Sequence, residues 1–237
     1  MTGKFEVIKF KEVEARIYLR DDADKSVAAE IFKWGEYRSA DKVVESCDLP
    51  ILDVGAHIGI FSLYAKMLNP EAKVYALEPE TDNFSVLKKN RAENDFARDI
   101  KLFKVALAKE TGVRKLKIEK DSINHCLEKN TEEDEGACYE EVRAVSLRDF
   151  LVENEIAEVG LLKMDIEGGE YEIFDNFLPG DFARIKNIIL EYHNYYGRSR
   201  EEIENILRKN GFGVQIFPSR FEKDLGFLFA KNKRSRK

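Results

Sequence analysis

The 237-residue sequence lacks the cysteine patterns that mark disulfide frameworks and zinc sites. Its three cysteines, Cys47, Cys126 and Cys138, are odd in number and contain no C-x-x-C pair. This predicts reduced thiols in an intracellular protein, so we expect a cytoplasmic location. No apolar run reaches the roughly 18 residues that a membrane span needs. Residues 1–11 alternate charged and apolar side chains, unlike a secretory signal.

The sequence also lacks an excess of basic charge. A net charge of −6 and a pI near 5.4 argue against a general nucleic-acid-binding surface. Residues 231–237 are the exception, with five basic residues in seven. They predict a solvated tail, and docking to RNA or anionic lipid is the alternative. Residues 128–141 carry seven carboxylates in fourteen, which predicts a solvated loop or, alternatively, a lid over a substrate.

Three short apolar runs that each end in a carboxylate are the most informative feature present. They lead to Asp53, Glu78 and Asp165, and the first continues through a glycine-containing turn into an apolar helical segment. Parallel strands with such ends bring their carboxylates together at one edge of a sheet, where nucleoside-bearing cofactors bind. The three runs are Ile51–Gly59, Val74–Pro79 and Leu161–Gly168.

The first turn indicates which cofactor binds. Gly55 and Gly59 bracket it and allow the backbone to approach a ligand closely. The middle glycine of a dinucleotide fingerprint is replaced by His57, and Asp53 adds negative charge where a pyrophosphate would lie. S-adenosylmethionine carries a sulfonium and an ammonium but no phosphate, so it suits an acidic turn. Glu78, at the end of the next strand, is expected to accept hydrogen bonds from both ribose hydroxyls.

These residues resemble a known family. The segments Asp53–Gly59, Leu77–Pro79 and, most specifically, Lys163–Glu170 (KMDIEGGE) are similar to the FkbM-type methyltransferases. The resemblance runs from about Asp24 to about Phe229. It implies a Rossmann-like class I fold and methyl transfer from S-adenosylmethionine, typically to an oxygen. The substrates that it implies are diverse and include polyketides, sugars and lipid-linked glycans.

The alternation of strands and helices predicts an α/β fold with a mostly parallel seven-stranded sheet, helices on both faces and an antiparallel last strand. We expect an N-terminal extension over residues 1–45 (a strand ribbon plus a helix capped by Asp24) packing on a methyltransferase domain over 46–230, and the basic tail over 231–237. Lys101–Leu107 is expected to be one strand, with Val105 and Ala106 beside the adenine.

The chemistry of methyl transfer requires alignment of acceptor, methyl group and sulfur, and a base helps when the acceptor is a hydroxyl. Asp165 is expected to contact the cofactor or orient the acceptor. His193, which closes the fifth strand, is the candidate proton acceptor. Lys163 should pair with Asp165, Asp53 or Glu191. His57 is expected to pack or bond backbone in the cofactor turn, and His125 to lie on the loop that could touch substrate.

No metal site is expected, because no spacing demonstrates one, although Asp165, Glu167 and Glu191 are oxygen ligands of the kind that Mg²⁺ accepts. The cofactor-binding set that we expect contains Asp53, Gly55, Ala56, Gly59, Glu78, Pro79, Val105, Ala106 and Asp165.

The function expected from these residues is S-adenosylmethionine-dependent O-methylation of a small molecule, sugar or lipid-linked glycan, with S-adenosylhomocysteine as the product. An RNA methyltransferase is the alternative that the basic tail would suit. The overall acidity and the absence of an Asn-Pro-Pro-Tyr-type motif, which base-amino methylation would use, count against it. A noncatalytic binding module or an NAD-type enzyme is the third possibility.

Overall fold

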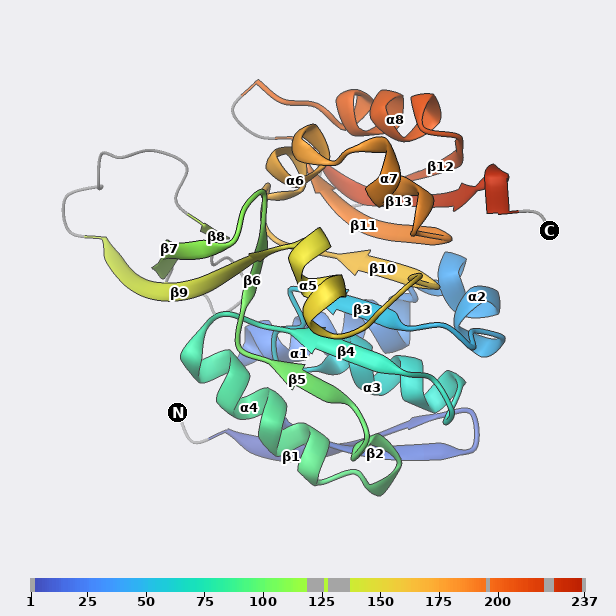
Figure 1. Cartoon of the computed structure of the whole chain (residues 1–237). Helices are drawn as coiled ribbons and strands as arrows, with labels where there is room; N and C mark the ends of the chain where they lie inside the picture. Colours follow the sequence, from blue (N-terminus) through green and yellow to red (C-terminus); the bar gives the residue numbers. More distant parts are fainter. Residues whose placement is uncertain (1–2, 119–125, 128–136, 195–196, 220–223, 236–237) are drawn as a thin grey trace.

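A seven-stranded sheet forms the centre of the computed structural model, which describes residues 3–118, 126–127, 137–194, 197–219 and 224–235 (Figure 1). Its strand order is β12-β13-β11-β10-β3-β4-β5. The pairs from β11 through β5 are parallel, and β13 runs antiparallel to both of its neighbours. This confirms the expected mostly parallel sheet with an antiparallel last strand. The strands are β3 Ile51–Val54, β4 Val74–Leu77, β5 Lys101–Phe103, β10 Leu161–Met164, β11 Asn187–His193, β12 Phe212–Pro218 and β13 Leu225–Asn232.

Helices cover both faces of this sheet, and each face has its own apolar core. Because side chains alternate across a strand, Ile51 packs on one face and Leu52 on the other. In Figure 1, α5 lies in front of the sheet, and α1 and α3 lie behind it. Helices on the Ile51 face are α1 Asp22–Ala29, the π-helix Glu30–Trp34, α2 Asp41–Glu45, α3 Ile60–Leu68 and α4 Thr81–Ala92. Those on the Leu52 face are α5 Leu147–Glu153, α6 Glu170–Asn176, α7 Pro179–Ala183 and α8 Arg200–Lys209.

A second, four-stranded sheet corrects one expectation. Residues 101–107 do not form one strand, because the chain leaves the central sheet after Phe103 and resumes as β6. There Ala106 pairs in parallel with Ala144, so pairing with a distant strand prevails over continuation of the local apolar run. This sheet has the order β6-β9-β7-β8 and consists of β6 Ala106–Ala108, β7 Gly112–Ile118, β8 Cys126–Leu127 and β9 Cys138–Ser146.

The cap of α1 is also different from the expectation. The side chain of Asp21 caps the helix by accepting from the backbone N–H of Asp24. Asp24 itself is fully buried and binds the guanidinium of Arg20 at 2.9 and 3.0 Å. Asp24 therefore forms an ion pair with Arg20, and Asp21 caps the helix.

The segment expected to be a basic tail, residues 231–237, begins inside strand β13. Strand β13 runs to Asn232, whose buried amide donates to the carbonyls of Phe182 and Ile185 at 3.2 and 3.0 Å. In the described part of the chain, no helix is long and apolar enough to cross a membrane.

The N-terminal ribbon is joined to the domain through two buried asparagines. The ribbon consists of β1 Lys4–Phe10 and β2 Val13–Leu19. Asn94 accepts from the backbone N–H of Arg16 at 2.8 Å and donates to its carbonyl at 2.9 Å. Asn90 does the same with Tyr18 at 2.7 and 3.3 Å. The two side chains thus pair with the free edge of β2 as another strand would.

We expect Asn94→Ala to lower the free energy of unfolding by about 2–3 kcal/mol, because it removes a buried side chain and both of its hydrogen bonds to the backbone N–H and C=O of Arg16. Urea denaturation would measure the loss. Asn176→Ala is the matched control, since this exposed asparagine makes one local bond to the carbonyl of Glu172. Equal effects from the two substitutions would contradict the bridging role of Asn94.

Candidate active site

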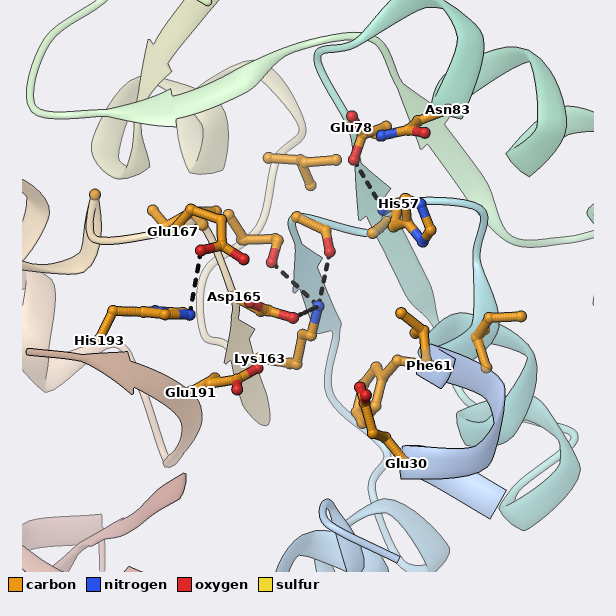
Figure 2. A pocket seen from close by; sticks show the side chains of 18 of the residues that line it. Glu30, His57, Phe61, Glu78, Asn83, Lys163, Asp165, Glu167, Glu191 and His193 are labelled. Carbon is orange, nitrogen blue, oxygen red and sulfur yellow. Dashed lines mark hydrogen bonds and ion pairs between the residues drawn. The ribbon is translucent and has the colours of Figure 1, made fainter. Parts of the chain in front are cut away.

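A cavity of about 540 Å³ opens at the carboxyl ends of β3, β4, β10 and β11 (Figure 2). Such an edge of a parallel sheet is where ligands bind in open α/β folds. The structure brings most of the expected site residues to this cavity, and the two exceptions are Asp53 and Gly59. The expected residues that line it are Gly55, Ala56, Glu78, Pro79, Val105, Ala106, Asp165 and His193.

The turn after β3 packs directly against the end of β10. Gly55 has a φ of 71°, and a Cβ added there would lie 1.8 Å from the carbonyl oxygen of Asp165. The backbone N–H of Asp165 in turn donates to the carbonyl of Val54 at 3.1 Å. The glycine turn and the Asp165 segment therefore form one unit, although more than 100 residues separate them in the sequence.

Glu78 presents a carboxylate that its own backbone surroundings hold in place. Its side chain is buried, and its two oxygens accept the backbone N–H groups of His57 and Glu80 at 2.8 and 2.9 Å. Burial opposes the charge and these two donors favour it, and the balance raises the pKa of Glu78 to about 7. Since each carboxylate oxygen can accept more than one hydrogen bond, Glu78 keeps acceptor capacity toward the cavity that it lines.

His57 links this turn to the N-terminal segment. It has a φ of 50°, a left-handed conformation that is unusual without glycine. Its Nε2 lies 3.0 Å from the guanidinium of Arg20 and 3.3 Å from the carboxylate of Asp24. Arg20 also donates to Asn83 at 2.7 Å. These contacts were not predicted from the sequence. The spacing of Arg20 and Asp24 is a local signal, but no pattern connects these two residues to His57 or to Asn83.

Asp53 and Gly59 lie beneath the cavity and do not line it. Asp53 is fully buried and accepts from the hydroxyl of Ser62 at 2.6 Å. The ammonium of Lys163 lies 3.2 Å from Asp53, donates to the carbonyl of Gly55 at 2.7 Å and lies 3.9 Å from Asp165. This confirms that Lys163 pairs with carboxylates. Burial opposes its charge, but Asp53 and Asp165 outweigh burial and raise the pKa of Lys163.

Val105 and Ala106 are buried and line the cavity where the chain passes from β5 to β6. Leu107 lines it as well, so this wall is apolar and offers no polar side chain of its own. A wall of short apolar residues suits a flat ring. His125 and residues 128–136 fall outside the described residues. Of the segment 128–141, which was expected to form a solvated loop or, alternatively, a lid, residues 138–141 lie in β9.

The other end of the cavity carries carboxylates. Asp165, Glu167 and Glu191 line it together with His193, whose Nε2 lies 3.4 Å from Glu167. Burial disfavours the imidazolium, but the nearby carboxylates of Glu170, Glu167 and Asp165 prevail and raise the pKa of His193 to about 10. A pKa raised in this way favours the protonated imidazole at neutral pH. That charge state is unsuited to the proton-accepting role expected from the sequence.

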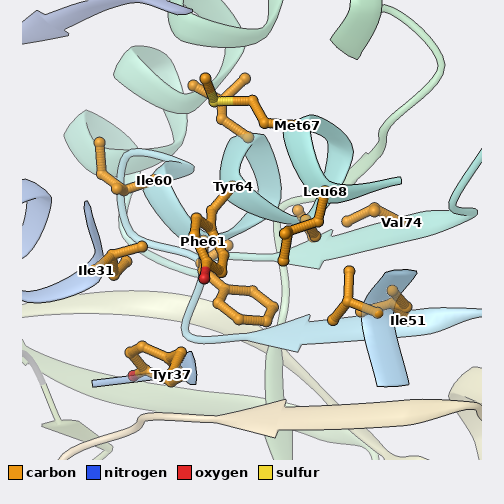
Figure 3. Packing of buried hydrophobic residues seen from close by; sticks show 14 of the residues in the cluster. Ile31, Tyr37, Ile51, Ile60, Phe61, Tyr64, Met67, Leu68 and Val74 are labelled. Carbon is orange, nitrogen blue, oxygen red and sulfur yellow. The ribbon is translucent and has the colours of Figure 1, made fainter. Parts of the chain in front are cut away.

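The N-terminal segment supplies a wall that sequence reasoning also missed. The ring of Tyr37 packs on Phe61 of α3 (Figure 3), with 5.1 Å between the ring centroids. The hydroxyl of Tyr37 lies 3.4 Å from Asp165. Glu30 and Glu36, on either side of the left-handed cap at Gly35, also line the cavity. The apolar spacing of this segment predicted a helix, but it gave no sign that its polar side chains meet the site.

We expect Gly55→Ala to lower the free energy of unfolding by more than about 2 kcal/mol, because a Cβ would clash with backbone and the residue would keep a left-handed φ. Gly180→Ala is the matched control, since a Cβ there meets nothing within 4 Å and the residue lies in α7. Thermal or urea unfolding of both variants measures the difference. A Gly55→Ala protein as stable as wild type would contradict the close approach of the two segments.

Comparison with known proteins agrees with this geometry. The model of the methyltransferase FkbM domain matches residues 53–214. The chain is 29% identical over 191 residues to the 31-O-demethyl-FK506 methyltransferase FkbM of Streptomyces tacrolimicus, covering 69% of this chain and 72% of that protein. It is 27% identical over 191 residues to methyltransferase sdnD of Sordaria araneosa, covering 69% and 73%.

A solved structure supports the fold. Magnesium protoporphyrin IX methyltransferase (ChlM) of Synechocystis PCC 6803, solved with S-adenosylmethionine bound, superimposes with a TM-score of 0.53 at 13% identity. The match covers 91% of this chain and 86% of that one. The expected Rossmann-like class I fold is thereby confirmed. The match to the methyltransferase FkbM domain confirms S-adenosylmethionine as the cofactor. The chain belongs to the FkbM family of S-adenosylmethionine-dependent methyltransferases.

Proposed function

We propose that this methyltransferase transfers its methyl group to a hydroxyl oxygen of a small molecule, a sugar or a lipid-linked glycan. The observation that carries the proposal is the position of Asp165. Its carboxylate lines the cavity beside the turn that approaches the cofactor, 3.4 Å from the Tyr37 hydroxyl and 3.9 Å from the Lys163 ammonium. The relative from Streptomyces tacrolimicus is named for methylation at an oxygen, which favours the same chemistry here.

The residues that would hold the cofactor lie along one side of the cavity. Glu78 would accept the ribose hydroxyls, and Val105 with Ala106 would flank the adenine. Gly55 and Ala56 would bring backbone close to the methionine part. The bound cofactor supplies a methyl group already activated by its sulfonium. The protein then has to align an acceptor oxygen with that group and exclude water.

Removal of the acceptor's proton is the remaining chemical task. Asp165 would accept it as the new carbon–oxygen bond forms. The Lys163 ammonium and the Tyr37 hydroxyl fix the orientation of the Asp165 carboxylate, while Lys163 is itself held by Asp53 and the Gly55 carbonyl.

Cofactor affinity should fall as the pH is lowered through about 7, the pKa of Glu78 in the unliganded protein. Ribose hydroxyls donate to the charged carboxylate, so below that pH binding must first remove one proton. The expected slope is about tenfold per pH unit. Calorimetric titration with S-adenosylhomocysteine, repeated from roughly pH 5.5 to roughly pH 8.5, measures this dependence of cofactor affinity on pH.

Glu78→Gln should bind more weakly and lose this slope. Glu36→Gln is the matched control, because burial also raises the pKa of Glu36 to about 7 but its carboxylate has no place in the ribose site. The assignment fails when Glu78→Gln retains the wild-type slope.

Asp165→Asn should lower turnover by about 10²–10⁴-fold, the range of a lost general base, while cofactor affinity changes by less than about tenfold. Deuteromethyl-labelled S-adenosylmethionine and a panel of hydroxylated acceptors, read by mass spectrometry and NMR, would locate the transferred group. Asp175→Asn, on an exposed residue paired with Arg198, is the control. Label found on nitrogen or on RNA would contradict the proposal, and so would full activity of Asp165→Asn.

A further inference from the structure

Two carboxylates and one imidazole meet at the acceptor end of the cavity. Asp165 follows β10, Glu167 lies in the loop to α6, and His193 ends β11 (Figure 2). One ligating atom from each lies within 4.8 Å of those of the other two. Nε2 of His193 lies 3.4 Å from Oε2 of Glu167. Side-chain adjustments of about 1 Å would bring all three atoms to coordination distance of a common centre.

The imidazole is held with one nitrogen toward this centre. Its Nδ1 lies 3.7 Å from Oε1 of Glu170, which is fully buried behind it. Glu170 is fixed in turn by the backbone N–H of Ile166, which donates to it at 3.0 Å. The hydroxyl of Tyr171 donates to the carbonyl of His193 at 3.0 Å and anchors that backbone. A buried carboxylate behind a histidine is the arrangement that orients metal-binding imidazoles in proteins.

The negative charge around this centre is a second, independent reason to expect a bound cation. Glu30, Glu36 and Glu191 line the same cavity in addition to Asp165 and Glu167. The ammonium of Lys163 is shared with Asp53 and the Gly55 carbonyl beneath the cavity. Burial and the charges of Glu30 and Asp165 raise the pKa of Glu36 to about 7, which is the effect of carboxylates crowded without enough positive charge. A divalent cation would relieve this repulsion.

We propose that Asp165, Glu167 and His193 bind a first-row divalent transition-metal ion, with Mn²⁺ as the representative. The ion takes the place of the proton on Nε2 of His193, because only an unprotonated imidazole nitrogen can bind a metal, and that proton is released to solvent. Two carboxylates and one imidazole form a mixed oxygen and nitrogen set, which suits such ions better than Mg²⁺, whose usual ligands are all oxygen. Three protein ligands leave open positions on the ion. The binding of the ion rests on the geometry alone, and its role toward the acceptor rests on the proposed function.

That role is to hold the acceptor hydroxyl through its oxygen and lower the pKa of that hydroxyl. The O–H bond breaks, and its proton passes to the Asp165 oxygen that does not bind the ion. The oxygen then forms its bond to the methyl carbon as the carbon–sulfur bond breaks, and that electron pair stays on sulfur. The ion therefore selects acceptors that can offer an oxygen ligand, and vicinal hydroxyl groups would fit two open positions.

Titration of the full chain with Mn²⁺, followed by the loss of the free-ion signal in electron paramagnetic resonance, tests the site without any methyl acceptor. We expect one bound ion per chain. Glu167→Gln and His193→Gln should each weaken binding by at least about tenfold, whereas Glu170→Gln, which acts through His193, should weaken it by about 10–100-fold. In a titration at a pH above the pKa of Glu36, which is about 7, Glu36→Gln removes one negative charge from the cavity without removing a ligand. It should weaken binding by less than about threefold.

Absence of Mn²⁺ binding at millimolar concentrations would overturn the site. Equal weakening by Glu36→Gln and Glu167→Gln would overturn it as well, because it would show only general attraction to negative charge. Thermal unfolding of each variant reports whether it folds, and the partly exposed Glu167 decides the result if His193→Gln does not fold. Titration with S-adenosylhomocysteine in the same samples separates this failure from failure of the methyltransferase assignment.

Discussion

The buried ammonium of Lys163 is the interaction on which the rest of the site depends. It lies at the end of β10, where its strand partner in register is Asp53 of β3. From there it contacts the carboxylates of Asp53 and Asp165 and the carbonyl of Gly55. A single buried charge thus joins the Gly55 turn to Asp165. Removing it would leave Asp53 charged, buried and without its cation, which is costly in a protein interior.

The N-terminal segment is part of the site as well as a cover for the sheet. Arg20 and Asp24 hold His57 in its left-handed conformation, and the backbone N–H of His57 then points at Glu78. Tyr37 places its hydroxyl beside Asp165. Both sides of the cavity are therefore fixed by residues that precede the first strand of the central sheet.

The sequence was sufficient to predict the central sheet and most of the cavity lining, because carboxylates at the ends of apolar strands carry a signal in their own segments. The bounds of β3 and α3 follow directly from the apolar runs. The break after Phe103 did not follow, because it depends on the pairing of Ala106 with a strand far along the chain. The charge of His193 is also set by residues brought together only in the fold, chiefly the buried Glu170.

Local patterns therefore identify which side chains reach the sheet edge, whereas their protonation states and partners depend on the tertiary structure. A crystal structure with S-adenosylhomocysteine bound would test the account most directly. The account predicts the ribose hydroxyls on Glu78, the adenine beside Val105 and Ala106, and the sulfur facing Asp165 across the cavity. A cofactor whose sulfur faces away from Asp165, or whose ribose makes no contact with Glu78, would contradict it.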